Sequence, residues 1–462
     1  MGVAVSNWRL ARAVSQLGHL GVVSGVAIDA VLVRRLQLGD DGGHMRRALA
    51  AFPVPGVGEQ IIEKYYVPGG KHGQRLVQMS MKRDKPSRQT EDLGVAAAFA
   101  EVFLAKEGHD GLVGVNHLEK VQATTLPMLY GAMLAGVDYV TMGAGIPKTI
   151  PAVLDKFAAG QPAELRIDVK GATPEDNFRS RFDPVEMMRG ELRPLARPQF
   201  LGIVSSHVLA TMLATKIEVL VDGFIVEAPT AGGHNAPPRG KLRLDEAGEP
   251  IYGERDVPDL DVIRDLGLPF WLAGGRAEPE QIQEALDLGA AGVQVGTAFA
   301  YCDESGFEAD IKRRVIDLSR QSQAQVFTDP VASPSGFPFK VVTLEGTLSQ
   351  ENLYENRRRI CELGYLRSAY RRSDGKMGWR CAAEPVELYV RKGGDEKDTV
   401  GRKCLCSALM ANVGLPQVQR EGDLEPTLVT SGDDVAEVAR FVPAGADSFT
   451  AADVVRYLLP EG

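Results

Sequence analysis

The fold is decided by residues 269–300, PFWLAGGRAEPEQIQEALDLGAAGVQVGTAFA, in which two apolar runs flank a helical pattern. The first run ends in Gly274-Gly275 and the second in Gly296-Thr297. The stretch between them predicts a helix over 280–288, which begins after a proline and ends at Gly289. A strand, a helix and a second strand in this order are typical of a parallel sheet.

The same rhythm, an alternation of strand and helix patterns, extends through most of the chain. It predicts eight strands, which is the number that a closed (β/α)8 TIM barrel needs. The predicted strands cover residues 20–24, 76–81, 112–116, 138–142, 200–205, 223–228, 269–273 and 292–296. Further helices are predicted over 93–107 and 126–135. The fold class is therefore α/β.

Two segments interrupt the rhythm and are interpreted as insertions, at about 34–73 and 164–193. After about residue 314 the rhythm fades, and a stretch rich in Pro, Ser and Gly follows. We therefore expect a barrel over residues 1–325 and a smaller C-terminal α+β region over 326–462 that carries four of the cysteines.

Composition excludes some classes of partner and favours a cytoplasmic protein. The formal net charge of −9 argues against nucleic acid. No apolar run approaches the roughly 18–20 residues that span a bilayer, so no membrane partner is expected. Trp8, Arg9 and Arg12 interrupt any secretory signal, and five cysteines, an odd number, indicate a reducing compartment.

Glycines at the ends of the last two predicted strands indicate a phosphate site. They let the backbone approach a ligand closely and point N–H groups at it. In TIM barrels the loops after the seventh and eighth strands recurrently bind phosphate. We expect Gly274, Gly275, Gly296 and Thr297 to bind a monophosphate such as that of FMN. The alternative is that these glycines only cap helices.

A histidine lies on the loop after the sixth predicted strand, in the sequence TAGGHNAPPRG. This places His234 at the C-terminal mouth of the barrel, where an imidazole can act as a base or a hydrogen-bond donor. His117, at another strand end, is a second candidate.

The run LAGG, with EALDLGAAGVQVGTAF after it, resembles the FMN-phosphate signature of the nitronate monooxygenase (2-nitropropane dioxygenase) family and of related flavin enoyl reductases. AGGH resembles the same family's catalytic motif, which implies that His234 accepts a proton from a nitroalkane or stabilises a nitronate. The family usually continues GGHRG, whereas Pro237 and Pro238 reshape the loop of this chain.

The opening MGVAVSNWRLARAVSQLGHLGVVSG resembles the family's N-terminal signature and implies that Gly2, together with Ser6, passes close to the flavin ring. The family has several apolar residues before this point, so the barrel is expected to lack part of its opening strand or to begin further upstream. Asn116 matches a family asparagine near the flavin, and its amide suits the pyrimidine edge; a turn residue at a strand end is the alternative.

The resemblance implies an FMN-dependent oxidation of alkyl nitronates by O2 to a carbonyl compound and nitrite, with a small-molecule substrate and O2 as partners and no catalytic metal. A homodimer is left open. The alternative is an enoyl reductase that uses FMN and NAD(P)H, as in fatty acid or polyketide synthesis. A third possibility is a scaffold protein that keeps a vestigial barrel.

Cys361, Cys381, Cys404 and Cys406 follow the spacing C-x19-C-x22-C-x-C, with Cys302 standing apart. Four thiols in one segment suit a structural zinc or an iron–sulfur site. The alternative is a set of thiols that pack as small apolar side chains.

Overall fold

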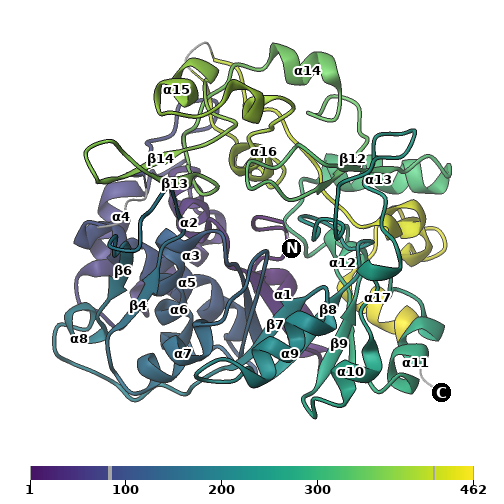
Figure 1. The fold of residues 1–462 in the computed structure, drawn as a ribbon, viewed down its shortest axis with the longest axis horizontal. Helices are drawn as coiled ribbons and strands as arrows, with labels where there is room; N and C mark the ends of the chain where they lie inside the picture. The colour runs from purple at the N-terminus through teal and green to yellow at the C-terminus, as the bar shows by residue number, and fades with distance from the viewer. Residues whose placement is uncertain (1, 82–85, 420–421, 461–462) are drawn as a thin grey trace.

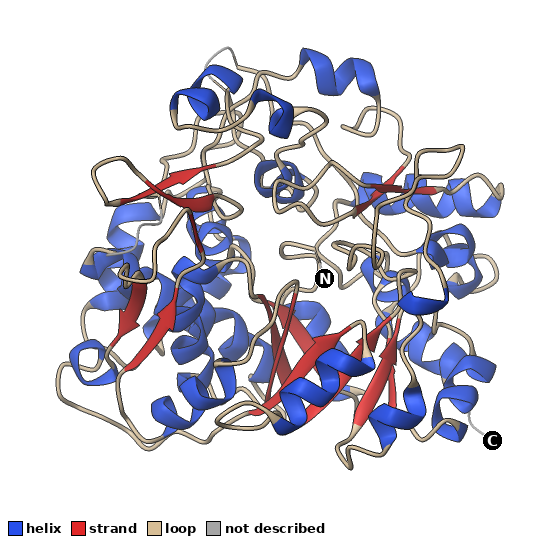
Figure 2. Ribbon diagram, in the orientation of Figure 1, coloured by secondary structure: helices blue, strands red, loops and turns tan. Residues whose placement is uncertain are grey.

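The computed structural model describes residues 2–81, 86–419 and 422–460, and a parallel sheet forms its centre (Figure 2). Seven strands hydrogen-bond in the order β1-β2-β3-β7-β8-β9-β10, and every neighbouring pair is parallel. Their bounds are β1 (Gly21–Ser24), β2 (Val113–Leu118), β3 (Tyr139–Gly143), β7 (Gln199–Val204), β8 (Gly223–Glu227), β9 (Phe270–Ala273) and β10 (Gly292–Gln294). The α/β class is confirmed, and β1 and β10 form the two edges of a half-barrel.

The predicted strand over 76–81 is wrong, so the described residues give seven parallel strands rather than eight. The polar groups of this segment are paired with side chains and not with a neighbouring strand. The N–H of Leu76 donates to the Gln417 side chain at 2.9 Å, and Val77 exchanges two hydrogen bonds with the Gln37 side chain. The apolar alternation that predicted a strand serves instead to bury Leu76.

Helices cover the outside of the sheet, and the predicted ones at 93–107, 126–135 and 280–288 are confirmed as α5, α6 and α11. Gly289 ends α11 with φ +88°, the left-handed conformation typical of that position. The helices before residue 325 are α1 (Trp8–Gln16), α2 (Ile28–Gln37), α3 (His44–Ala50), α4 (Val57–Tyr65), α5 (Arg88–Lys106), α6 (Gln122–Leu134), α7 (Ile150–Ala158), α8 (Pro184–Met187), α9 (His207–Thr215), α10 (Leu260–Arg264), α11 (Pro279–Asp287), α12 (Thr297–Ala300) and α13 (Ala309–Arg320). None of the helices in the described ranges is long and apolar enough to cross a membrane.

The two segments interpreted as insertions contain elements of their own. The first holds α3 and α4, which bury Met45, Leu49 and Ile61 in the same apolar core as the sheet. The second holds β4 (Ala163–Arg166), which pairs antiparallel with β6 (Arg179–Phe182), and β5 (Val169–Lys170).

The C-terminal region packs along the mouth of the sheet and shares its cores with the N-terminal part. In Figure 1 its green helices lie in the upper part of the view, above the teal strands β7, β8 and β9. The strands and α-helices of the C-terminal region are β11 (Val326–Asp329), β12 (Phe339–Val342), α14 (Glu351–Asn356), β13 (Ser368–Arg371), β14 (Met377–Arg380), α15 (Val386–Arg391), α16 (Leu405–Ala411) and α17 (Ala451–Leu458). This region also contains the 3-10 helices η3 (Glu396–Thr399) and η4 (Asp433–Phe441). The 3-10 helices η1 (Asp41–Gly43) and η2 (Glu254–Asp256) lie in the N-terminal part.

Two apolar clusters join the beginning and the end of the chain. One contains Val5 and Leu10 together with Phe449 and Val454. The other contains Val31 and residues of α16. Residues 326–462 therefore share two apolar clusters with the N-terminal part, whereas the buried residues of the cluster around the sheet all precede residue 291.

Candidate functional site

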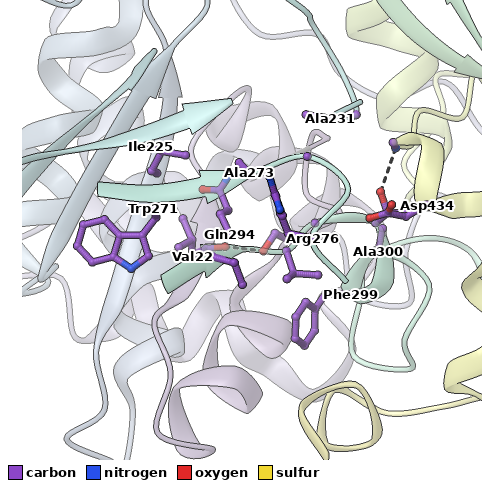
Figure 3. A pocket seen from close by; sticks show the side chains of 18 of the residues that line it. Val22, Ile225, Ala231, Trp271, Ala273, Arg276, Gln294, Phe299, Ala300 and Asp434 are labelled. Atoms are coloured by element: carbon purple, nitrogen blue, oxygen red, sulfur yellow. Dashed lines mark hydrogen bonds between the residues drawn. The ribbon is translucent and has the colours of Figure 1, made fainter. Parts of the chain in front are cut away.

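A cavity of about 520 Å³ opens at the C-terminal ends of β8, β9 and β10 and extends down between the two edge strands. Its walls include Val22 of β1, Trp271 of β9 and Gln294 of β10 (Figure 3). Carboxyl ends of parallel strands are where ligands bind in α/β proteins, because the loops there are free to vary around a rigid sheet. The position and volume of this cavity suit a small organic ligand.

Gly274, Gly275, Gly296 and Thr297 line this cavity together, as the sequence predicts. Gly274 and Gly275 have φ angles of +90° and +63°, and residues other than glycine rarely adopt such angles. A Cβ on Gly274 would lie 2.8 Å from the Thr230 hydroxyl, whereas a Cβ on Gly296 would meet open space. At these glycines no side chain stands between the backbone and the cavity.

Three backbone N–H groups are available at this wall. Within the described residues, the N–H groups of Gly275, Gly296 and Thr297 donate to no protein acceptor. Unpaired N–H groups that face a cavity can donate to an anion bound there, as they do at helix N-termini and glycine-rich loops. The wall is thus suited to a phosphate, and Arg276 is the cation beside it, paired with Glu284 at 2.7 Å.

A segment of the C-terminal region closes one side of the same cavity. Thr430, Ser431, Gly432 and Asp434 are among the lining residues. The Gly432 N–H donates to the Thr297 hydroxyl at 3.0 Å, and Figure 3 shows Asp434 entering from this segment beside Ala300. A Cβ on Gly232 would lie 2.7 Å from the Gly432 nitrogen, so the histidine loop and the C-terminal segment are in close contact.

Glu227, at the end of β8, is a titratable residue of the sheet that lines the cavity. Burial raises the pKa of Glu227 to about 7. A carboxyl group with this pKa can hold or release a proton at neutral pH. Burial also raises the pKa of Asp434 across the cavity.

His234 lies one residue beyond the lining, since Gly232 and Gly233 face the cavity and the imidazole does not. Its Nε2 and the Ser333 hydroxyl form a 2.7 Å hydrogen bond, and its ring packs edge-on against Phe339 at 4.8 Å between centroids. Burial lowers the pKa of His234 to about 4, so the ring is neutral at physiological pH. The catalytic role of His234 stays a prediction.

The remaining predicted contacts fall into two groups. Gly2 and Ser6 line the cavity. Asn116 does not; it is buried and donates to the Thr141 hydroxyl at 2.9 Å, and Thr141 is the residue that reaches the cavity. His117 is buried as well, away from the lining.

Sequence reasoning missed three parts of the site. Glu227 lies inside the strand predicted over 223–228 and was assigned no role there, although a carboxylate that follows a run of apolar strand residues is itself a signal. Thr230 packs against Gly274 from the loop that carries the histidine motif. The segment 430–434 has no local signal, because its position depends on packing across more than 130 residues of chain.

An α/β half-barrel with a glycine-lined cavity at its strand ends is the class that the fold and site define. Residues 191–341 match the family model described as nitronate monooxygenase, and these residues carry the AGGH, LAGG and GT motifs. The resemblance to this family is confirmed over residues 191–341, which include the glycine motifs of the cavity.

Two curated proteins are similar to this chain in sequence. A (3aS,4S,5R,7aS)-5-hydroxy-7a-methyl-1-oxo-octahydro-1H-indene-4-carboxyl-CoA dehydrogenase of Mycobacterium tuberculosis is 27% identical over 250 residues, 51% of this chain and 65% of the relative. A nitronate monooxygenase of Pseudomonas aeruginosa is 37% identical over 121 residues, 25% of this chain and 32% of the relative. The chain thus covers less than two thirds of the length of either relative.

Among solved structures, FabK from Thermotoga maritima has a TM-score of 0.47 at 17% identity and covers 98% of this chain and 88% of its own. A nitroalkane oxidase from Streptomyces ansochromogenes has a TM-score of 0.43 at 16% identity and covers 99% of this chain and 92% of its own.

Proposed function

We propose that this chain is an FMN-dependent oxidoreductase that binds the flavin in the cavity between β1 and β10. The observation that carries the proposal is the glycine wall, where three unpaired N–H groups lie beside a volume of about 520 Å³. The family match over residues 191–341 supports it independently.

The residues present fit FMN. Gly275, Gly296 and Thr297 would hold the phosphate through their N–H groups and the Thr297 hydroxyl. The apolar walls, among them Val22 and Trp271, would exclude water around the ring system. Bound FMN would supply the electron transfer, and the protein would supply position and electrostatics.

Nitronate oxidation is the first candidate reaction, and the family match supports it. Its carbon is already deprotonated, so the chain needs to bind and orient an anion and to admit O2. His234 is neutral at physiological pH and outside the lining, so it would act here by supporting the Gly232-Gly233 loop, which faces the cavity.

Proton transfer to or from a thioester substrate is the second candidate, and Glu227 favours it. A carboxyl group with a pKa of about 7 can deliver or accept a proton beside the ligand. The relative of 27% identity acts on a coenzyme A thioester, and the similarity to it spans twice as many residues as that to the nitronate monooxygenase. Such a reaction would use NAD(P)H or NAD(P)+ as the second substrate.

Anaerobic absorbance spectra of the FMN-loaded protein test both candidates. Reduction of the flavin by an alkyl nitronate alone supports the first reaction. Reduction by NADPH alone, without a response to nitronate, supports the second. A protein that takes up no FMN contradicts the proposal as a whole.

The variant Glu227→Gln tests whether Glu227 transfers a proton in a protein that still binds FMN. The variant is expected to keep FMN and its reduction by nitronate, because the amide is isosteric and that reaction transfers no proton from carbon. Loss of thioester turnover by about 100-fold or more in the same variant supports proton transfer by Glu227. Equal turnover in both proteins excludes that role.

A further inference from the structure

A second cavity, of about 190 Å³, lies beyond the carboxyl end of β2. Its lining comes from three parts of the chain: the loop that leads from β2 into α6, the segment between β4 and β5, and the C-terminal region. The last two parts are held together because β5 pairs in parallel with β13. The second cavity shares no lining residue with the cavity proposed for the flavin, so flavin binding does not account for it.

The first turn of α6 faces the second cavity with unpaired donors. Gln122, Ala123 and Thr124 line the cavity, and within the described residues their backbone N–H groups donate to no protein acceptor. Val121, at the N-cap of α6, has an apolar side chain and caps none of them. The first N–H groups of a helix have no partner inside the helix, and together with the aligned peptide dipoles they favour an anion.

The side chain of Thr124 gives an independent indication of a ligand. It is 5% exposed and lines the second cavity, and its hydroxyl forms no hydrogen bond within the described part of the chain. A buried hydroxyl without a partner is destabilising, so such groups are nearly always paired. The neighbouring Thr125 shows the usual solution, since its hydroxyl donates to the Val121 carbonyl at 3.1 Å. The Thr124 hydroxyl is therefore available to a group bound in the cavity.

Two positive side chains line the second cavity from different parts of the chain. Lys120 precedes α6, and Arg367 precedes β13, with its guanidinium 5.5 Å from the ring centre of Trp379. Among the described residues, Asp168 is the one carboxylate of the lining, and its side chain is 70% exposed and 3.8 Å from the Lys120 ammonium. Water screens the charge of so exposed a carboxylate. Glu119, outside the lining, lies 3.6 Å from the same ammonium. The charges of the lining therefore favour an anionic ligand.

A chain of hydrogen bonds joins the second cavity to the histidine loop. Ser335 lines the second cavity, and its hydroxyl lies 2.7 Å from that of Ser333. Ser333 in turn forms the 2.7 Å hydrogen bond to His234, which follows Gly233 of the first cavity. The two cavities are thus linked through side chains at the carboxyl ends of the strands, where α/β proteins bind their ligands.

We propose that the second cavity binds a phosphate group, which accepts hydrogen bonds from the Thr124 hydroxyl and the first N–H groups of α6 while Lys120 and Arg367 balance its charge. Phosphate oxygens accept several hydrogen bonds at once, and Lys and Arg are their usual cationic partners. Two sources carry this chemistry: free inorganic phosphate, and the phosphate monoester of a nucleotide such as NADPH. The site itself does not depend on the flavin proposal.

The melting temperature of the full chain tests the proposal when it is measured with excess FMN, at rising concentrations of inorganic phosphate and constant ionic strength. Binding is expected to stabilise the wild type, and Thr124→Val should raise the apparent Kd for phosphate by about 10-fold or more. Thr125→Val is the matched control, because its hydroxyl belongs to the same helix turn but lies outside the lining, and it should respond as the wild type does. General stabilisation by phosphate acts on all three chains alike. Equal responses of wild type and Thr124→Val would overturn the proposal.

Lys120→Met tests the charge of the site separately. Its side chain is 39% exposed, so the substitution leaves the core intact and serves as the test if Thr124→Val does not fold. The apparent Kd for phosphate is expected to rise about 3-fold or more. Lys156→Met, which removes an exposed charge on α7, is the control and should leave the Kd unchanged. The same Kd in both lysine variants would exclude Lys120 from the site.

NADP+ and NAD+, used in place of inorganic phosphate, distinguish the two sources. NAD+ lacks the phosphate monoester, so a nucleotide source predicts that NADP+ binds about 10-fold more tightly than NAD+ and that Thr124→Val removes the difference. A free-phosphate source predicts that inorganic phosphate binds and that the two nucleotides do not differ. If neither inorganic phosphate nor NADP+ binds in a way that depends on Thr124, the phosphate site is contradicted. FMN uptake is measured on the same samples, so a failure of the flavin proposal is seen separately.

Discussion

The backbone N–H of Gly432 donates a 3.0 Å hydrogen bond to the hydroxyl oxygen of Thr297. These residues come from the C-terminal region and from the glycine wall at the end of β10, and both line the cavity. The Thr297 hydroxyl accepts from Gly432, so its own proton remains available for a ligand. The C-terminal region is therefore a structural part of the site.

Thr297→Val tests this arrangement because it removes the hydroxyl and keeps the shape of the side chain. We expect the dissociation constant for FMN to rise about 10- to 100-fold, since a hydrogen bond to a charged phosphate contributes about 1.5–3 kcal/mol. Quenching of flavin fluorescence in a titration measures it. Thr215→Val, which removes an exposed hydroxyl on α9, is the control and should bind FMN as the wild type does. Equal affinities in the two variants would exclude Thr297 from the phosphate site.

Gly274→Ala tests the close approach of the backbone. The new Cβ would lie 2.8 Å from the Thr230 hydroxyl and 3.0 Å from the Ala231 nitrogen, so the wall of the cavity must shift. Gly267→Ala is the matched control, because Gly267 has φ +73° and no neighbour within 4 Å of a Cβ. Both variants are expected to lose about 1 kcal/mol of stability through backbone strain.

Only Gly274→Ala should also lose FMN affinity, by about 10-fold or more. Urea unfolding and FMN titration of the same preparations separate the two effects. A Gly274→Ala protein that binds FMN normally would show that this part of the wall is not in contact with the ligand.

The raised pKa of Glu227 predicts how the stability of the apoprotein depends on pH. Its pKa in the folded apoprotein is about 7, above the value of about 4.5 for an exposed glutamate. Between these values the carboxyl ionises only in the unfolded chain, so the free energy of unfolding falls as the pH rises from about 4.5 to 7, by up to about 3 kcal/mol. Below this window the carboxyl is protonated in both states and the effect is absent.

Glu227→Gln should remove that part of the pH dependence. Urea unfolding of the apoproteins at several pH values across the window measures the difference between wild type and variant. Parallel curves for the two proteins would mean that the carboxyl of Glu227 ionises normally in the folded state.

His234 should remain neutral across the physiological range. Burial lowers the pKa of His234 to about 4, and Ser333 hydrogen-bonds to its Nε2. The Cε1–H resonance of His234, assigned by its absence in His234→Gln, is expected not to shift between about pH 5 and 8. A resonance that titrates within this range would restore the imidazolium as a partner for an anionic substrate.

Local patterns predicted most of the sheet and the glycine wall. Seven of the eight predicted strands form, and the last two end in the glycines that line the cavity. Local patterns suffice here because a buried parallel strand reads as an apolar run, and a backbone that must approach a ligand requires glycine. Residues 76–81 show the limit of this reasoning, since the pairing of their polar groups with Gln37 and Gln417 leaves no trace in the segment itself.

Long-range packing accounts for what the sequence could not predict. The contact between Gly432 and Thr297 joins residues 135 positions apart. The raised pKa of Glu227 arises from burial, which a strand pattern does not specify. The spacing of the cysteines left a metal site and apolar packing open, and only the folded chain places Cys361, Cys381 and Cys404 in one apolar cluster.

The most direct test of the central claim is a comparison of FMN with riboflavin, which has the same ring system and no phosphate. The flavin is removed from the purified protein, and each compound is then titrated while its fluorescence is followed. If the glycine wall binds the phosphate, one FMN binds per chain and riboflavin binds at least about 100-fold more weakly. Equal affinities for the two compounds, or no binding of either, would contradict the assignment of this cavity as a flavin site.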